Sequence, residues 1–109
     1  MPKLNKSEID PYTILVASAT GAGDSKEPDI ASTGWTFQAT MGTAGTTTAT
    51  VDIEVSNDEV QWIVMGTITL NGVSDTDGYA SSASWAFVRA NVKALGTPGT
   101  TEVTVTMGV

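Results

Sequence analysis

Four carboxylates near the middle of the chain have the type and spacing for catalysis. They are Asp52, Glu54, Asp58 and Glu59. Asp52 and Glu54 would share one face of a strand, where a pair of carboxyl groups could hydrolyse a glycosidic bond. The opposite face would carry Val51, Ile53 and Val55. A charged outer face over an apolar inner one is ordinary for a half-buried strand, so we predict that the protein is not an enzyme.

A second acidic group, Asp75-Thr76-Asp77-Gly78, resembles the opening of a calcium-binding loop. The residues that follow supply no closing bidentate glutamate, so a solvated turn is favoured and a cation stays as the alternative. Cysteine and histidine are both absent. Without them the usual catalytic triads and zinc sites cannot be built, and we assign no metal or cofactor.

The aromatic residues suggest contact with another macromolecule. Trp35 and Trp62 are expected to fill the core. Trp85, Phe87 and Arg89 alternate with the small residues Ala86, Val88 and Ala90. If the small residues face the core, then Trp85, Phe87 and the only arginine of the chain form an exposed strip of the kind enriched at interfaces.

Charge and hydropathy exclude several classes of partner. The net charge is −7 and no cluster of Lys or Arg could follow a phosphate backbone, so neither nucleic acid nor an anionic membrane surface is an expected partner. The longest apolar run, 14–17, is far shorter than a membrane-spanning helix requires. The first residues do not form a secretory signal.

The elements that would position these residues are strands. Threonine, valine and glycine are abundant, and runs at 34–41, 50–55, 60–70, 86–95 and 101–107 are separated by turn signals. We therefore predict an all-β fold, an antiparallel β-sandwich or jelly roll with an extended N-terminal arm. Helical spacing also fits 85–95, but its β-branched and aromatic residues favour a strand.

Turns and irregularities can be placed on the same pattern. Gly66 is expected to form a bulge, and Asn71-Gly72 a tight turn. We expect Val60, Trp62 and Val64 to share one strand face. The polar segment 74–84 is predicted to be a loop.

The chain divides into residues 1–31, an arm with a connector, and residues 32–109, the sandwich. One strand is expected within the arm, at 12–19. It could join the sandwich of its own chain or be donated to a neighbouring subunit. In the second case the contact residues would include Tyr12, Ile14 and Val16.

The stretch 51–58, with Trp62, Gly66-Thr67 and then the segment 85–92, resembles a pattern in small phage virion β-sandwich proteins. Glu59 stands where that pattern usually has glycine. The resemblance is to capsid decoration, or cement, proteins and spans about residues 34–109.

That resemblance implies a virion structural protein of a bacteriophage, made in the host cytoplasm and placed on the capsid surface. It would bind across subunits of the major capsid protein or another virion protein, as a homo-oligomer with a homotrimer favoured. The alternative is a carbohydrate-binding or receptor-binding β-sandwich module of a tail fibre or secreted enzyme, which would use its tryptophans as stacking platforms.

Overall fold

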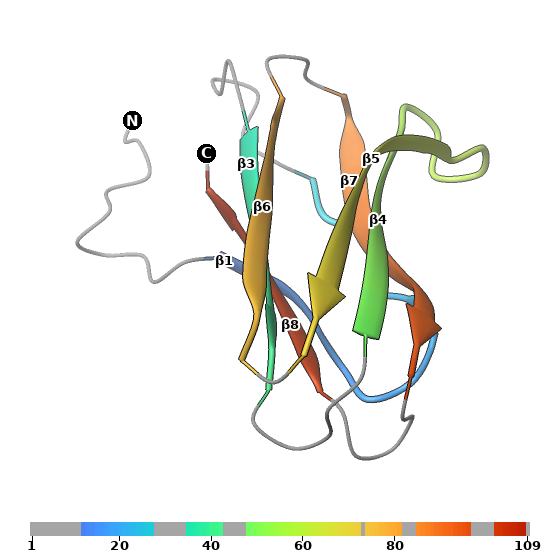
Figure 1. The fold of residues 1–109 in the computed structure, drawn as a ribbon. Helices are drawn as coiled ribbons and strands as arrows, with labels where there is room; N and C mark the ends of the chain where they lie inside the picture. Colours follow the sequence, from blue (N-terminus) through green and yellow to red (C-terminus); the bar gives the residue numbers. More distant parts are fainter. Residues whose placement is uncertain are drawn as a thin grey trace.

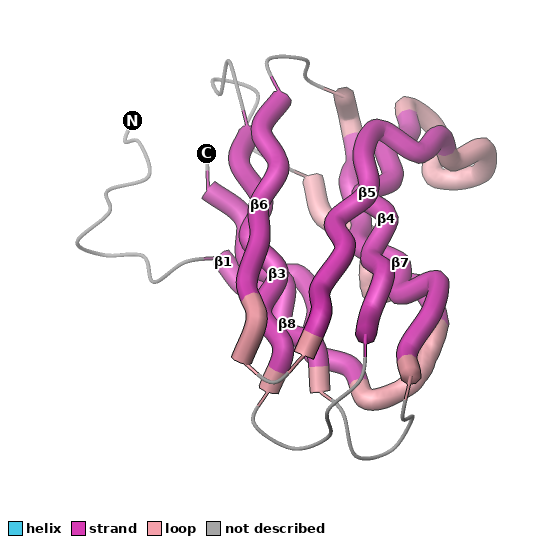
Figure 2. Tube along the Cα trace, viewed as in Figure 1, coloured by secondary structure: helices cyan, strands magenta, loops and turns pink. Residues whose placement is uncertain are grey.

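Alternation of apolar and polar residues is the pattern that builds this fold. The computed structural model describes residues 12–27, 35–42, 48–72, 74–81, 85–96 and 102–108. Within them lie eight strands, and no helix is present in this part of the chain (Figure 2). The strands are β1 (Tyr12–Ala17), β2 (Gly21–Ala22), β3 (Trp35–Met41), β4 (Thr48–Ser56), β5 (Ile63–Asn71), β6 (Thr76–Ser81), β7 (Phe87–Leu95) and β8 (Val103–Gly108).

The strands form two antiparallel four-stranded sheets that pack face to face (Figure 1). Sheet A has the order β1-β8-β3-β6 and sheet B the order β2-β7-β4-β5. The first strand thus lies beside the last, the second beside the seventh, the third beside the sixth and the fourth beside the fifth. This is jelly-roll connectivity, and it confirms the predicted fold class.

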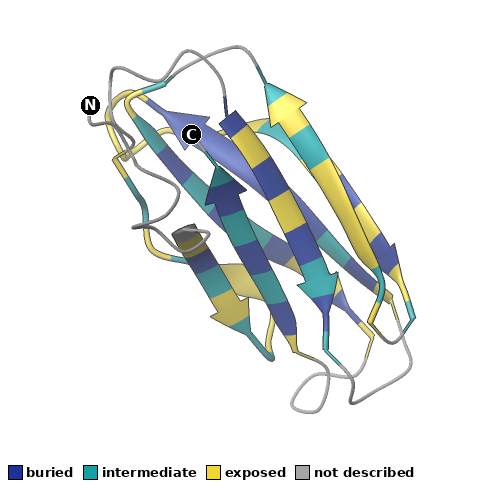
Figure 3. Ribbon diagram, turned by 90° about the vertical axis from the view of Figure 1, so that its left-hand side faces the viewer, coloured by how far each residue is buried: buried dark blue, intermediate teal, exposed yellow. Residues whose placement is uncertain are grey.

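The core lies between the sheets and is made mainly by alternate residues of β3, β4, β5, β7 and β8 (Figure 3). Trp35 and Phe37 meet edge to face, with ring centroids 6.3 Å apart. The other large, fully buried side chains are Met41, Ile53, Ile68, Leu70, Met107, Val51, Val55, Val88, Val92, Val103 and Val105. The core position predicted for Trp35 is confirmed, and so is the strand interpretation of the segment around Val88.

The strand expected within the arm joins the sandwich of its own chain. β1 is the edge strand of sheet A and pairs with β8, with a register shift between Thr13 and Leu15. Residues 1–11 and 28–31 of the expected arm and connector lie outside the described residues.

The bulge predicted at Gly66 is present in β5, one residue earlier. Its register against β4 shifts between the pairs Ile53 with Gly66 and Glu54 with Val64, which leaves Met65 as the extra, bulged residue. A Cβ atom added at Gly66 would lie 2.6 Å from the ring of Tyr79 on β6. The Tyr79 hydroxyl donates a hydrogen bond to the Met65 carbonyl at 2.9 Å. The bulge therefore fastens the edge of sheet B to the edge of sheet A.

The predicted loop at 74–84 is wrong over much of its length. Residues Thr76–Ser81 form β6, which pairs with β3. Asp77 and Gly78 resemble turn residues, but an edge strand needs few apolar residues, and here Tyr79 supplies the inward contact. The turn at Asn71-Gly72 is present, yet it leads from sheet B to sheet A and does not close a hairpin.

Candidate contact surfaces

The outer face of sheet B carries an ion pair between neighbouring strands. Glu54 of β4 and Arg89 of β7 stand opposite each other in the register, and Arg89 Nε lies 2.7 Å from Glu54 Oε1. Asn91 Nδ2 donates to the other oxygen, Oε2, at 2.9 Å. Glu54 is only 5% exposed. The carboxylate is thus enclosed and satisfied by two neighbours, although it lies on the outer side of the sheet.

Trp62 covers the guanidinium group of this pair. The Cζ atom of Arg89 lies 4.2 Å from the centroid of the Trp62 ring, which is a cation–π contact. Trp62 is half-buried and is not part of the core between the sheets. The prediction that Trp62 fills the core is therefore wrong, because the residue precedes β5 on its outer side, where Arg89 supplies the surface against which the ring packs.

The two strand carboxylates do not form a shared site. Asp52 accepts a hydrogen bond from the Thr67 hydroxyl at 2.8 Å, whereas Glu54 is held by Arg89. Each carboxylate therefore stabilises a contact between neighbouring strands. Among the residues that the structure describes, no group of three or more potential metal ligands is found.

The two carboxylates that follow β5, Asp75 and Asp77, also accept hydrogen bonds from nearby backbone groups. Asp75 Oδ2 accepts from the backbone N–H of Asn71 at 2.7 Å. Asp77 Oδ1 accepts from the N–H of Gly78 at 2.8 Å. Both carboxylates thus bond to the nearby main chain, Asp75 at the turn after β5 and Asp77 within β6.

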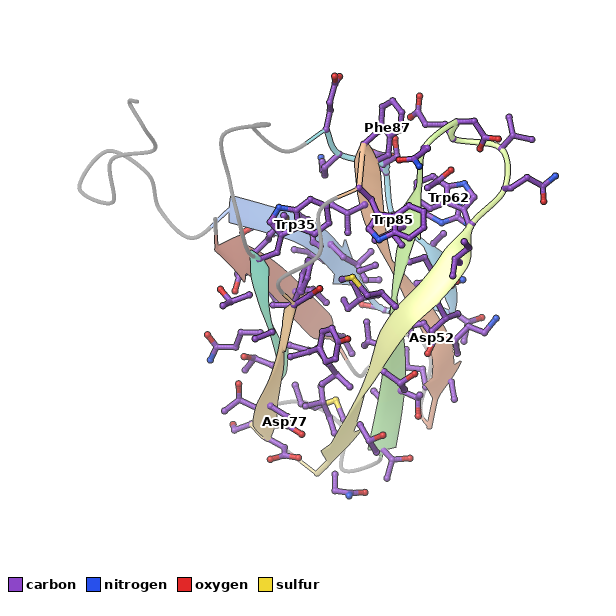
Figure 4. All side chains as sticks on the ribbon, turned by 90° about the horizontal axis from the view of Figure 1, so that it is seen from above. Trp35, Asp52, Trp62, Asp77, Trp85 and Phe87 are labelled. Atoms are coloured by element: carbon purple, nitrogen blue, oxygen red, sulfur yellow. The ribbon has the colours of Figure 1, made fainter. Side chains whose placement is uncertain are left out.

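The expected strip of Trp85, Phe87 and Arg89 is divided among different environments. Phe87 begins β7 opposite Ser56 and is half-buried. Trp85 precedes the strand and packs against the core, so it does not lie in an exposed row with Phe87. Figure 4 shows Trp62, Trp85 and Phe87 toward the same end of the sandwich. Arg89 is engaged by Glu54 and Trp62, which leaves little of this strip open to a partner.

The loop between β4 and β5 holds its shape through its own side chains. Asp58 Oδ1 accepts hydrogen bonds from the backbone N–H groups of Gln61 and Val60, each at 2.9 Å. These donors, Gln61 first and then Val60, together with the Ser56 hydroxyl, hold the pKa of Asp58 below its usual value near 3.8. Asn57 Oδ1 accepts from the N–H of Ala86 at 3.1 Å, which attaches the loop to the start of β7.

Glu59 lies in this loop with φ at +61°, in the left-handed region that glycine adopts most easily. The Ser25 hydroxyl donates a hydrogen bond to Glu59 Oε2. The departure from the resembled pattern thus falls on a residue whose backbone still has the conformation that glycine favours.

Exposed aliphatic side chains gather where this loop enters β5. Val60 is 73% exposed, and Ile63 and Val64 are 52% and 51% exposed. β5 has only β4 as a neighbour in its sheet. We call these three residues the aliphatic end of β5. Sequence reasoning placed Val60 and Val64 on one strand face but did not identify them as a surface, because alternation alone cannot show that the face lacks cover.

The three expected contact residues of the first strand also separate. Ile14 is buried in the core, which removes it from the candidate surface. Ile14 is also the extra residue at the register shift, so Val16, which strict alternation would place on the same side as Ile14, lies on the other side, opposite Thr104. Val16 is 57% exposed on the outer side of sheet A. For Tyr12 the structure describes the backbone only, which pairs with Met107.

None of the described segments forms a helix long and apolar enough to cross a membrane. No protein-family model matches this chain, and neither the curated proteins nor the solved structures contain a match to it.

Proposed function

We propose that the chain is a virion structural protein, a capsid decoration protein that stabilises a phage head shell by binding across its subunits. The observation that carries this proposal is the aliphatic end of β5, where Val60, Ile63 and Val64 lie within five residues of one another and are each more than half exposed. The resemblance of residues 34–109 to decoration proteins supplies the class of partner, the major capsid protein or another virion protein.

The aliphatic end is suited to a permanent contact because the loop that presents Val60 is held in place by hydrogen bonds. Asp58 fixes the loop that presents Val60, and Asn57 attaches that loop to the segment before β7. A surface that is ordered before binding loses little conformational entropy on binding. Apart from the Met65 carbonyl, which accepts from the Tyr79 hydroxyl, the side of β5 away from β4 adds main-chain donors and acceptors that an extended segment of a partner could pair with.

The mechanism is thermodynamic linkage. A protein that binds only the assembled shell shifts the equilibrium towards assembly and stabilises the shell in proportion to its occupancy. Neither catalysis nor a cofactor is needed for this function.

The test is binding to empty head shells of the phage that encodes the chain. Wild-type protein should co-sediment with shells and raise their mass at saturation. A variant with Val60→Ser, Ile63→Thr and Val64→Thr should bind roughly tenfold or more weakly, because apolar contact area is lost. Thr69→Ser, on the same strand, is the control and should bind like wild type. No affinity of the wild type for shells would refute the proposal.

The carbohydrate-binding alternative has weaker support. One face of the Trp62 ring is covered by Arg89, and Trp85 packs against the core, so neither ring is a fully open platform for a sugar. A glycan array separates the two functions. Specific binding that is lost in Trp85→Phe would favour a carbohydrate-binding module over a decoration protein.

A further inference from the structure

The outer face of sheet A is a regular surface of threonines and small residues. Register and burial place its side chains in three rows across the strands. One row is Val16, Thr104, Thr40 and Thr76, the next is Thr13, Thr106, Gln38 and Gly78, and the third is Gly108, Thr36 and Ala80. We call this surface the threonine face.

The threonine face contains no charged side chain, although the chain has a net charge of −7. Two charged residues adjoin it, Asp77 of β6 and Glu102, the exposed residue before β8. Glu102 lies two residues before Thr104, so it is on the same outer side and borders the first row. In the register Asp77 stands opposite Ala39, which is buried on the inner side of the sheet. Asp77 therefore belongs to the inner side at the open edge. On the opposite sheet, by contrast, the outer face contains Asp52, Glu54 and Arg89.

Polar groups at the β3–β6 side of this face already satisfy one another. The Thr76 hydroxyl donates to the Ala39 carbonyl at 3.0 Å. It also accepts from Gln38 Nε2 at 3.0 Å, and lies 3.0 Å from the Thr40 hydroxyl. Burying polar groups is costly only when their hydrogen bonds are lost. A partner that covers these three side chains would therefore leave these hydrogen bonds intact, while the amide oxygen of Gln38 would still need a donor from the partner.

From these observations we infer that the threonine face is a contact between two copies of this chain. Two copies that each carry −7 repel each other, and the repulsion is smallest where neither contact surface bears a charge. The aliphatic end of β5 is less suited to self-contact, because the loop that presents Val60 itself carries two carboxylates, Asp58 and Glu59, whereas a single carboxylate, Glu102, borders the threonine face. It remains available for a different partner.

The size of the face sets the expected affinity. Four strands about 4.8 Å apart and six residues long, at about 3.3 Å per residue, cover roughly 20 Å by 20 Å in projection. This is small beside the roughly 800 Å² per partner of a standard interface. Two such faces packed at about 10 Å give a weak complex, with a Kd on the order of 0.1 mM.

The experiment is sedimentation of the purified chain, without shells, from about 10 µM to 1 mM. Wild type should pass from monomer to oligomer across this range. Gln38→Glu is nearly isosteric and places one carboxylate in the middle of the face, so like charges would meet across the contact and raise Kd roughly tenfold or more. Gln61→Glu adds the same charge on the exposed loop before β5 and should leave Kd within about threefold.

Equal effects of the two variants would show only general repulsion and would overturn the inference, as would a wild-type chain that stays monomeric at 1 mM. Because no shell is present, this result is independent of the decoration proposal. Shell binding could fail while self-association persists, and the reverse is also distinguishable.

Discussion

Thr106 and Arg89 occupy comparable places in the two halves of the molecule. Each lies on the second strand of its sheet and points away from the core. Around Thr106 the neighbours across the strands are Thr13 and Gln38, which are small or uncharged. Arg89, by contrast, contacts two neighbours at once. Its Nε atom lies 2.7 Å from Glu54 Oε1, and its Cζ atom lies 4.2 Å from the centroid of the Trp62 ring.

This difference shows how one strand pattern can give surfaces with different sensitivities. On the threonine face each side chain contributes a small amount through packing and β propensity, so removing one leaves its neighbours intact. On the outer face of sheet B the Glu54 carboxylate is buried, and its solvation has been replaced by Arg89 and Asn91. Removing one partner there leaves a charge without compensation.

The largest expected effect tests this sensitivity directly. Arg89→Ala should lower the free energy of unfolding by about 3 kcal/mol, because Glu54 stays enclosed without its counter-ion. Thr106→Ala, on the other face, should cost about 1 kcal/mol or less. Urea unfolding of both variants, compared at equal m-values, measures the difference.

A double variant separates the lost ion pair from lost packing. Glu54→Gln with Arg89→Met removes both charges and keeps a long side chain over the Trp62 ring. Its stability should lie well above that of Arg89→Ala, because no unpaired charge remains. If Arg89→Ala costs no more than Thr106→Ala, then solvent screens the ion pair and the two faces are equally sensitive to the loss of one side chain.

Much of this architecture could be predicted from the sequence. Strict alternation at 35–41 and 87–92 identified the strands and their inner faces, because a half-buried strand must repeat every two residues. β6 was missed because its sequence, with Asp77 and Gly78, is that of a turn. Only its place at the edge, beside β3, makes it a strand.

The contacts on sheet B could not be predicted in the same way. Glu54 and Arg89 are 35 residues apart, and their pairing depends on the register between β4 and β7, which shifts between Thr50 and Val51. A shift of one residue would turn every following side chain to the other face. The sequence identified Arg89 as distinctive, but its partners follow from register, which a single sequence does not specify.

A smaller effect is expected at Glu59, in the loop at the end of sheet B. Its φ of +61° strains any residue with a Cβ atom, so Glu59→Gly should raise the melting temperature slightly or leave it unchanged, even though the bond from Ser25 is lost. Glu59→Ala loses the same bond and keeps the strain, so it should be less stable than Glu59→Gly by about 1 kcal/mol. Thermal unfolding followed by circular dichroism compares the two.

The reverse order, with Glu59→Ala the more stable, would mean that the loop does not hold the left-handed conformation in solution. If instead Glu59→Gly is more stable but binds shells more weakly than wild type, then Glu59 contributes to shell binding at a cost in stability. That outcome would extend the contact surface from the aliphatic end of β5 to the carboxylate beside it.

The smallest expected effect is that of low pH, to which the loop that carries Asp58 and the threonine face should respond differently. The backbone N–H groups of Gln61 and Val60 stabilise the charged form of Asp58 and lower its pKa in the folded chain. Stability from this group is therefore complete above the unfolded pKa of about 3.9 and is lost as the pH falls through the lower folded pKa. Asp58→Asn keeps an acceptor but removes the charge. The stability difference between wild type and Asp58→Asn should therefore be constant from pH 7 to about pH 5 and shrink below about pH 4.

The rows of the threonine face have no titratable side chain, so acid acts on the contact through the net charge and through Glu102, the carboxylate at its border. As the pH approaches the isoelectric point near 4.1, repulsion between copies fades and self-association should strengthen while the Asp58 loop weakens. Urea unfolding and sedimentation at pH 7, 5 and 4 measure both responses on the same samples. A wild-type chain whose self-association weakens over this range would place an ionised carboxylate in the contact, and the threonine face would then not be the surface that two copies share.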